Sequence, residues 1–444
     1  MNSQQPANSI YVSYDKSLKV INTIFLCWGF ITIVNASLLA TFSKAVQPSG
    51  VVLDFFLGLE NLSGGLLKFS THHSLIFGFI FYCTYFICGL PAAYLIKRTG
   101  VKKSMEIGLI IGASAVFILV PGARSQSFTL LMTGIFIQAT GITILQTTCN
   151  PYVIFVGRSK EGASRLAFAG AHNSFGAWVA PFIGTLISVA VPEGMIGSEA
   201  VIYQTELIVL PYVLITVLFA GMAVLIHFSD LPEMNFFQNL TEKEKSVSIL
   251  KHKHVVLGFF AIMTYVCAEV LIAGKLIEPF LANQITAKEL AQSIGLVATY
   301  FAGCMMVGRF IGSSILKTAS TEKVLAICGL FALICTVLSM IIPTQEAMFF
   351  ILAIGLFNGP MWPAIFDLGV RNTGKKMPYA SGILVMGIIG AAIAIYLFQA
   401  IYVPIEIDLK SHQSSLKTAL IPVIICYTYI IYYAVSGYKS KPLT

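Results

Sequence analysis

Uncharged hydrogen-bonding side chains interrupt the long apolar runs of this sequence. The segment 146–157 reads QTTCNPYVIFVG and places Gln146 and Asn150 one helical turn apart. In hydrocarbon an unpaired amide is costly, so both side chains need a helix partner, a water-filled cavity or a ligand. Pro151 lacks an N–H and frees a carbonyl group one turn earlier, which usually bends a helix. A bent helix with a polar face is typical of a solute path.

Further amides occur in other apolar runs, and together they offer hydrogen bonds without fixed charge. Such a set suits neutral, hydroxyl-rich solutes better than ions. Each amide also has a purely structural interpretation, as a bond between helices worth about 0.6 to 2 kcal/mol. Trp362 is a candidate to stack on a sugar ring, although aromatic residues are common in membrane cores. The candidate substrate-binding residues are Asn35, Gln138, Gln146, Asn150, Asn173, Glu269, Asn358 and Trp362.

Two ionisable residues fall within apolar runs and are candidates for ion coupling. Glu269 lies about 20 Å along its predicted helix, near the middle of a membrane. A charge there costs at least about 2.5 to 3.5 kcal/mol, so we expect Glu269 to bind substrate or a cation, the alternative being a structural carboxyl paired between helices. His172 has a side chain that can carry a proton near neutral pH, and an equally good interpretation is a hydrogen-bonded packing residue.

Two glycine-containing segments echo each other in the two halves of the sequence. Gly89 begins GLPAA and is followed by Lys97 and Arg98, whereas the segment 308–312 reads GRFIG and is followed by Lys317. Small residues four apart allow close helix approach. We expect these motifs to form gates or staple loops near the membrane surface, with Arg309 toward an end of its helix. The residues concerned are Gly89, Arg98, Gly308, Arg309 and Gly312.

The elements that must position these residues are membrane helices. Hydrophobic residues make up 57% and charged residues only 11% of the chain, and apolar runs of about 20 residues recur. The sequence therefore predicts an all-α membrane protein with twelve transmembrane helices. They are centred in residues 20–46, 72–96, 104–121, 127–156, 166–191, 205–228, 255–281, 290–316, 323–342, 346–370, 378–402 and 415–437.

Charge placement predicts the topology. Basic residues recur in alternate loops, near 16–19, 97–103, 158–165, 317–323, 371–376 and 439–441, and the intervening loops are mostly acidic. By the positive-inside rule both termini are cytoplasmic. The net charge of +8 then reflects topology and contact with anionic lipid, and we expect no nucleic-acid partner.

A charged segment divides the chain into two halves of similar size. We predict a first six-helix half at 1–228, a cytoplasmic linker at 229–254 and a second six-helix half at 255–444. Asn150 with Pro151 in the fourth span corresponds to Asn358 with Pro360 in the tenth span. A six-plus-six repeat with substrate between the halves is the major facilitator architecture.

Several function classes lack support in the sequence. There is no phosphate-binding GxxxxGK[ST] loop, so transport powered by the chain's own ATP hydrolysis is not expected. The nine cysteines lie in predicted spans without a CxxC pair, which argues against a zinc or disulfide framework. His252 and His254 make too small a cluster for a metal site, and we interpret them as a solvated basic loop. We predict no enzyme, no metal and no cofactor.

The motifs together resemble the fucose/glucose/galactose:proton symporter family of the major facilitator superfamily. The resemblance is carried by segments in both halves, among them WGFIT at 28–32 with Asn35, QTTCNPY at 146–152, NSFG at 173–176, GRFIG at 308–312 and GLFN at 355–358. Gln146 is similar to the glucose/galactose branch, because the fucose branch tends to have glutamate there. The resemblance implies cation-driven uptake of a hexose, deoxyhexose or N-acetylhexosamine across a bacterial inner membrane. We expect a monomer.

One departure from the family leaves the coupling open. The family typically has Asn-Asp in the first span, whereas this chain has Asn35 and Ala36, and position 146 is glutamine. Coupling can have moved to Glu269, with or without His172; sodium can replace protons; or the chain can be a facilitator without a driving ion. The sequence is also compatible with a carrier for a non-sugar solute and with a membrane sugar sensor that does not transport.

Overall fold

The structure is a computed structural model that describes residues 7–45, 73–125, 127–189, 198–234, 248–273, 287–342, 344–401 and 417–439. Every regular element within these residues is a helix. Helices are the expected solution, because a chain in hydrocarbon must satisfy its backbone groups internally. Nine described helical segments are long and apolar enough to cross a membrane, and Ile421–Gly437 forms a shorter one.

Within the described residues, the first half contains seven long or medium helices and one short 3-10 helix. They are α1 (Ala7–Ala45), α3 (His73–Thr99), α4 (Val101–Ser114), α5 (Val116–Arg124), α6 (Phe128–Phe155), η1 (Ser159–Glu161), α7 (Gly162–Val189) and α8 (Ser198–Phe228). Each of the α-helices overlaps one predicted span, with α4 and α5 forming the third together. The predicted bounds of the fourth span, 127–156, differ from those of α6 by one residue at each end.

The second half follows the same plan. After η2 (Ile249–Lys251) in the linker, its described elements are α10 (Lys253–Leu271), α12 (Ala287–Ile315), α13 (Thr321–Ile341), α14 (Thr344–Asn358), α15 (Met361–Val370), η4 (Gly374–Lys376), α16 (Met377–Met386), η5 (Gly387–Ile389), α17 (Gly390–Ile401), α19 (Ile421–Tyr432) and η6 (Tyr433–Gly437). The tenth span is interrupted between α14 and α15, where Gly359 and Pro360 occur, because proline cannot continue the hydrogen-bond ladder.

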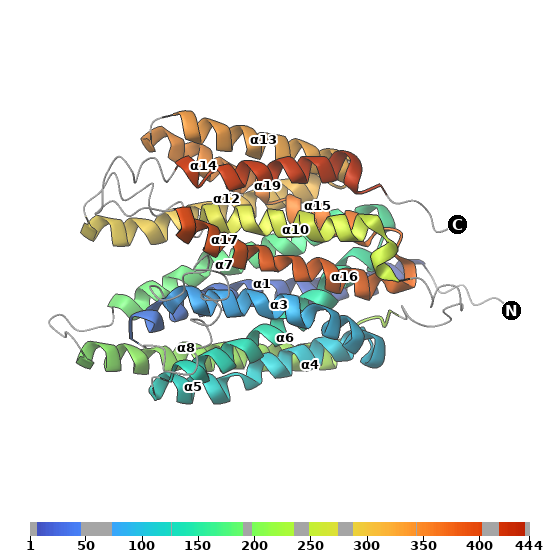
Figure 1. Cartoon of the computed structure of the whole chain (residues 1–444). Helices are drawn as coiled ribbons and strands as arrows, with labels where there is room; N and C mark the ends of the chain where they lie inside the picture. Colours follow the sequence, from blue (N-terminus) through green and yellow to red (C-terminus); the bar gives the residue numbers. More distant parts are fainter. Residues whose placement is uncertain are drawn as a thin grey trace.

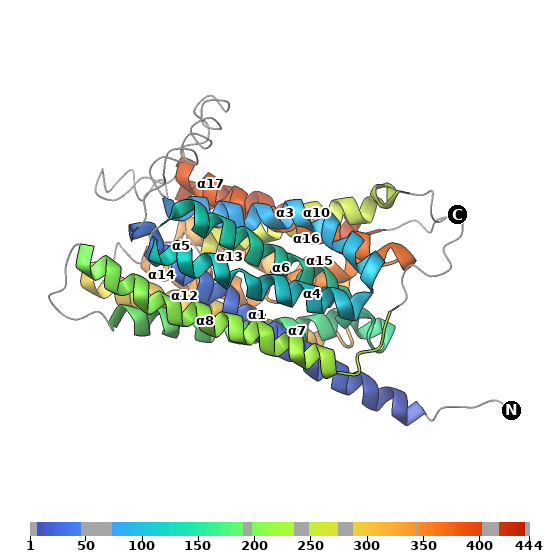
Figure 2. The same cartoon turned by 90° about the horizontal axis from the view of Figure 1, so that it is seen from below.

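The two halves lie side by side in one bundle, with the first half in blue to green and the second in yellow to red in Figures 1 and 2. They meet along two seams: α7 packs on α12, and α3 packs on α16 and α17. The α3–α16 seam is tight, because a Cβ at Gly382 would lie 2.5 Å from the carbonyl oxygen of Gly89. Glycine at both positions is what allows this approach.

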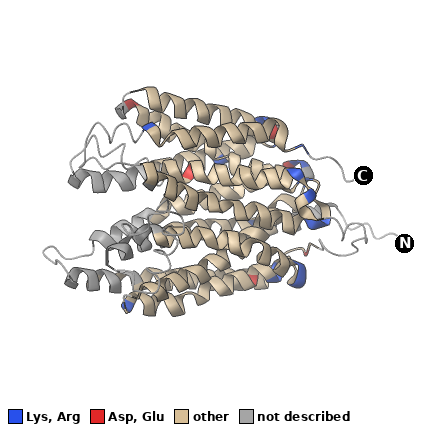
Figure 3. Cartoon of the chain, viewed as in Figure 1, with Lys and Arg blue, Asp and Glu red and all other residues tan. Residues whose placement is uncertain are grey.

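Most of the lysine and arginine residues that the structure describes lie at one end of the bundle (Figure 3), which we call the basic end. It carries the start of α4, the loop between α6 and α7, and the loop between α15 and α16. This placement agrees with the alternation read from the sequence. Most of the acidic residues of the intervening loops, including Asp54, Glu193 and Glu406, lie outside the described residues.

Contacts between the halves close the basic end. The Ser164 hydroxyl at the start of α7 donates to the Ser313 carbonyl near the end of α12, at 2.7 Å. On the α15 side, a Cβ at Gly162 would lie 2.9 Å from Oδ1 of Asp367. Arg371 donates to the other oxygen of Asp367 at 2.6 Å. The first turn of α7 therefore fits tightly against the carboxylate of the opposite half.

Candidate functional site

Glu269 stands at the centre of a group of polar side chains from several helices. It is half-buried on α10, within electrostatic reach of Arg309 on α12. The Tyr265 hydroxyl, one turn earlier on α10, lies close to both charges but forms no hydrogen bond of normal geometry with any described residue. Tyr82 of α3, in the first half, also lies within reach of this carboxylate. The acid predicted from the sequence is therefore approached from both halves.

Arg309 joins the two halves near this acid. Its side chain is buried, and Nη1 donates to the Gly170 carbonyl at 2.9 Å and to the Ser174 hydroxyl at 2.7 Å, both on α7. Its Nε has no partner among the residues that the structure describes. The sequence led us to expect Arg309 near a helix end as a loop staple. The structure instead gives it an inter-half contact and a position near Glu269, because a buried guanidinium needs acceptors and a counter-charge.

Two tyrosines connect the predicted amides to the same region. Gln146 Nε2 donates to the Tyr85 hydroxyl at 3.5 Å, one turn from Tyr82 on α3. On the other side, the Tyr427 hydroxyl of α19 donates to Asn358 Oδ1 at 2.8 Å and lies within electrostatic reach of Glu269. The amides of α6 and α14 are thus linked through tyrosines toward one carboxylate.

Four buried amides keep hydrogen-bonding atoms that no described residue pairs. They are Oε1 of Gln138, Oε1 of Gln146, Nδ2 of Asn150 and Nδ2 of Asn358. Buried polar groups are normally paired, so each unpaired one calls for an explanation such as water or a ligand. Trp362 adds an aromatic surface, with its ring 6.1 Å from that of Tyr265. This combination of amides, hydroxyls and aromatic rings can bind a neutral polyhydroxyl solute.

Other predicted residues lie elsewhere. Gln138 shares a face of α6 with Gly134 and Gly141, which pack on α5 and α4 within the first half. Asn173 Nδ2 donates to the Phe25 carbonyl of α1 at 3.0 Å, so this amide pairs two helices of one half. Asn35 lies in α1, and its side chain is outside the described residues.

His172 has surroundings different from those of Glu269. Its Nδ1 pairs with the Phe168 carbonyl of its own helix at 3.0 Å, and its ring lies 4.8 Å from that of Phe168 and 6.2 Å from that of Phe310. Both phenylalanines are exposed on the bundle surface. These contacts fit the packing interpretation of His172, with an aromatic cluster at the α7–α12 seam.

The glycine motifs serve close helix packing in the structure. A Cβ at Gly308 would lie 2.0 Å from the Leu356 carbonyl oxygen, and one at Gly312 would lie 2.5 Å from Pro360. Both contacts hold α12 against the α14–α15 span, and Gly89 has the same role at the α3–α16 seam. Arg98 stacks on the Tyr94 ring of its own helix, 4.7 Å from the ring centre.

The interpretation of His252 and His254 as a solvated loop is wrong. Both side chains are buried, with ring centres 5.7 Å apart. His254 Nε2 pairs with the Arg371 carbonyl at 2.8 Å, so it caps the carboxyl end of α15. Burial, aided by the charge of Lys376, lowers the pKa of His252 from its ordinary value. No cluster of three metal-ligating side chains occurs in the part of the chain described.

Tyr82, Tyr85, Tyr427 and Ser174 were not singled out from the sequence as site residues. Tyr82, Tyr85 and Tyr427 each place a hydroxyl within an apolar span, and that is the one signal available. A membrane tyrosine is also common as an interfacial residue. Only the packing of α3, α10 and α19 shows that Tyr82 and Tyr427 lie within electrostatic reach of the same acid, and that Tyr85 pairs with Gln146.

Pro151 leaves a carbonyl group of α6 free to bond with the other half. It lies within α6, and its missing N–H frees the Thr147 carbonyl four residues earlier. The Ser381 hydroxyl of α16 donates to this carbonyl at 2.7 Å, and both groups are buried. The sequence predicted the freed carbonyl, and the structure identifies its partner. The bond can exist only while α6 and α16 are in contact.

Replacing Ser381 with alanine is expected to open the basic end more often. The Thr147 carbonyl would lose its partner only in the closed arrangement, at a cost of about 1 to 3 kcal/mol, so the open population should rise at least about fivefold. Spin labels at Lys160 and Lys375, one in each half, would report the separation by double electron–electron resonance. Ser339→Ala is the matched control, because Ser339 bonds within one half. Equal distance distributions in both variants would contradict this role.

The comparisons with known proteins agree with this arrangement. The Major Facilitator Superfamily profile matches residues 20–395. The chain belongs to this superfamily. It is 32% identical over 429 residues to a glucose/galactose transporter of Brucella abortus, covering 96% of this chain and 95% of the relative. It is 27% identical over 400 residues to the L-fucose-proton symporter of Escherichia coli, covering 86% of this chain and 85% of the relative.

A solved structure shares the fold along almost the whole chain. It is that of the major facilitator transporter FucP in the outward conformation, with a TM-score of 0.77 and 25% identity, covering 95% of this chain and 98% of that one. The family predicted from the motifs is thus confirmed, and so is the twelve-helix major facilitator fold. The protein is a multi-pass membrane transporter with bacterial relatives, and its superfamily is one of transporters and not of enzymes.

Proposed function

We propose that the protein takes up a monosaccharide, namely a hexose, deoxyhexose or N-acetylhexosamine, across a bacterial inner membrane by alternating access. The observation that carries this proposal is the set of buried amides, Gln146, Asn150 and Asn358, with atoms that no described residue pairs. Tyrosines connect two of these amides to the region of a single acid. Hydroxyl groups of a sugar can both donate to and accept from such atoms. The named activities of the relatives in sugar transport support it.

We further propose that uptake is coupled to a cation through Glu269. Ala36 and Gln146 stand at two positions where members of the family can carry an acid in the membrane. Glu269 is an acid within electrostatic reach of Tyr82 in the first half and of Arg309 in the second. A bound proton or sodium ion would neutralise it and change its attraction for Arg309. Arg309 holds α7 of the other half, so ion binding would bias the contact between the halves.

The orientation and the division of the chain complete the proposal. The basic end faces the cytoplasm, both termini are cytoplasmic, and the halves are 1–228 and 255–444 with a cytoplasmic linker at 229–254. The contacts Ser164–Ser313, Thr147–Ser381 and Gly162–Asp367 then suit a state closed to the cytoplasm. Rocking of the halves would break them together. We expect the protein to work as a monomer.

The deciding experiment is uptake into proteoliposomes that contain only this protein. Labelled hexoses, deoxyhexoses and N-acetylhexosamines are offered with an imposed proton gradient, a sodium gradient or neither. Accumulation above equilibrium under one gradient is the expected result and identifies substrate and ion together. Equilibration without accumulation would support the uncoupled facilitator, which the absent acids at positions 36 and 146 favour. Binding without any uptake would indicate a sensor, and no response to any sugar would indicate another solute.

A further inference from the structure

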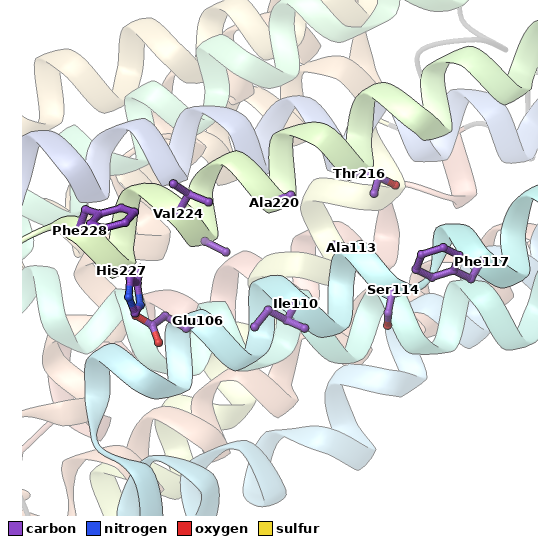
Figure 4. A pocket seen from close by; sticks show the side chains of 11 residues that line it. Glu106, Ile110, Ala113, Ser114, Phe117, Thr216, Ala220, Val224, His227 and Phe228 are labelled. Atoms are coloured by element: carbon purple, nitrogen blue, oxygen red, sulfur yellow. The ribbon is translucent and has the colours of Figure 1, made fainter.

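A groove on the outer surface of the first half is lined by α4, α5 and α8 (Figure 4). It encloses about 470 Å³ and is almost entirely apolar, which is within the range of about 300 to 1,000 Å³ typical of small-molecule sites. Ala113, Ala220 and Ala223 line it with small side chains. Phe117 and Phe228, 80% and 81% exposed, stand toward its two ends. This groove has no part in the central site.

One end of the groove is polar. His227 Nδ1 lies 3.3 Å from Glu106 Oε1, and both side chains line the groove, as Figure 4 shows. Lys102 Nζ donates to the carbonyls of His227 and Ser229, each at 2.9 Å. These bonds bring a fixed positive charge to the end of α8. Because the Glu106 carboxylate can only accept, Nδ1 of His227 is the donor of this pair. Nε2, on a largely exposed side chain, donates to a phosphate when the ring carries both protons.

Lys103 adds a second fixed charge to this end. It is exposed, and it precedes Glu106 by three residues and Ile110 by seven, so it shares the groove-lining face of α4. Lys103 lies in the first turn of α4 at the basic end, where the headgroup layer of a membrane meets the helix. The end of the groove therefore combines Lys102, Lys103 and His227 with one carboxylate, Glu106.

We propose that this groove binds one anionic phospholipid, with an acyl chain between α4 and α8 and the phosphate at Lys103 and His227. A hydrocarbon chain fits the apolar walls and the small side chains between them. Basic residues at the mouth of an interhelical groove are the usual means of holding an anionic headgroup. Both walls belong to one half, so the lipid stabilises that half in every stage of alternating access.

The test uses the full-length protein purified in detergent. Phosphatidylglycerol and phosphatidylcholine with identical acyl chains are added separately, and retained lipid is counted by native mass spectrometry alongside the thermal midpoint. We expect one phosphatidylglycerol to be retained and to raise the midpoint, because a ligand of the folded state stabilises it. Phosphatidylcholine should bind more weakly.

Two variants separate the contribution of the lipid's acyl chain to binding from that of its headgroup. Ala220→Phe fills the groove and should abolish retention of both lipids, whereas Leu210→Phe, on an exposed site of α8 outside the groove, should not. Lys103→Gln should weaken the binding of phosphatidylglycerol about fivefold and leave the binding of phosphatidylcholine unchanged. Because Lys103 is exposed, this variant does not depend on the folding of the groove.

Three outcomes would overturn the proposal. Retention of phosphatidylglycerol that Ala220→Phe and Lys103→Gln leave unchanged would place the lipid elsewhere. If the wild-type protein retained phosphatidylglycerol and phosphatidylcholine equally, the headgroup would not be recognised. A dimer that Ala220→Phe dissociates would show that a second copy of the chain, and not a lipid, covers the groove.

Discussion

Glu269→Gln is expected to abolish accumulation of sugar above equilibrium while leaving movement down a gradient measurable. Glutamine keeps the size and hydrogen-bonding capacity of the side chain but cannot take up or release a proton. The uptake of the variant should lose its dependence on an imposed gradient and on pH. The measurement is initial rate and plateau of uptake into proteoliposomes, with and without the gradient.

The control variants of this experiment distinguish coupling from folding. Glu161→Gln removes a carboxylate whose ion pair with Arg158 is at the surface, and such pairs contribute little, so accumulation should remain. Glu269→Gln also leaves the charge of Arg309 without this acid, which can destabilise the protein by about 3 to 5 kcal/mol. The double variant Glu269→Gln, Arg309→Gln removes both charges. It should recover protein level but not accumulation.

One result would rule out the role of Glu269 in coupling. That result is accumulation by Glu269→Gln to the wild-type plateau, with an unchanged response to pH. Substrate binding would then remain as the function of this acid. Sugar recognition itself rests on the amides, and the uptake panel tests it separately.

Gly308→Ala and Gly221→Ala are expected to change stability in opposite directions. A Cβ at Gly308 would lie 2.0 Å from the Leu356 carbonyl oxygen, so α12 and α14 must separate. Overpacking of this kind typically costs about 1 to 3 kcal/mol. A Cβ at Gly221 would meet no atom of the described residues within 4 Å, and alanine there gains up to about 1 kcal/mol of helix propensity.

The thermal midpoint of the two purified variants in the same detergent measures this difference. Both changes replace a helical glycine with alanine, so unfolded-state effects are shared and the difference reports packing. The α12–α14 contact also supports the helix that carries Arg309, and we expect Gly308→Ala to reduce transport. Equal midpoints for the two variants would contradict the close approach of α12 and α14.

The helices were predictable because hydrophobic length is a local property. Apolar runs long enough to cross a bilayer became helices, as α6 (Phe128–Phe155) and α13 (Thr321–Ile341) show. The interruptions were less visible. Pro360 indicates a break by its chemistry, but η5 at Gly387–Ile389 divides the eleventh span without a proline. There the backbone lies against α10, since a Cβ at Gly387 would be 2.8 Å from the Phe259 carbonyl oxygen.

Some site residues were predictable from the free-energy cost of placing a polar group in a membrane. An acid in the middle of an apolar run, Glu269, and a freed carbonyl before Pro151 both require partners wherever the chain folds. The partners themselves come from distant segments. Ser381 is 234 residues from Thr147, and Arg309 reaches α7 across 135 residues to Ser174. Sequence spacing within one helix carries no information about such pairs.

The sequence by itself therefore determined the membrane class, the spans, the basic loops and the polar residues that need an explanation, since each follows from transfer free energies of single segments. The tertiary structure decided which polar residues meet. It brings Tyr82, Tyr265 and Tyr427 within electrostatic reach of Glu269, and it places Gln138 on the face of α6 whose glycines, Gly134 and Gly141, pack on α5 and α4. The physical reason is that helix rotation and neighbour choice depend on packing across the whole bundle, which no single span encodes.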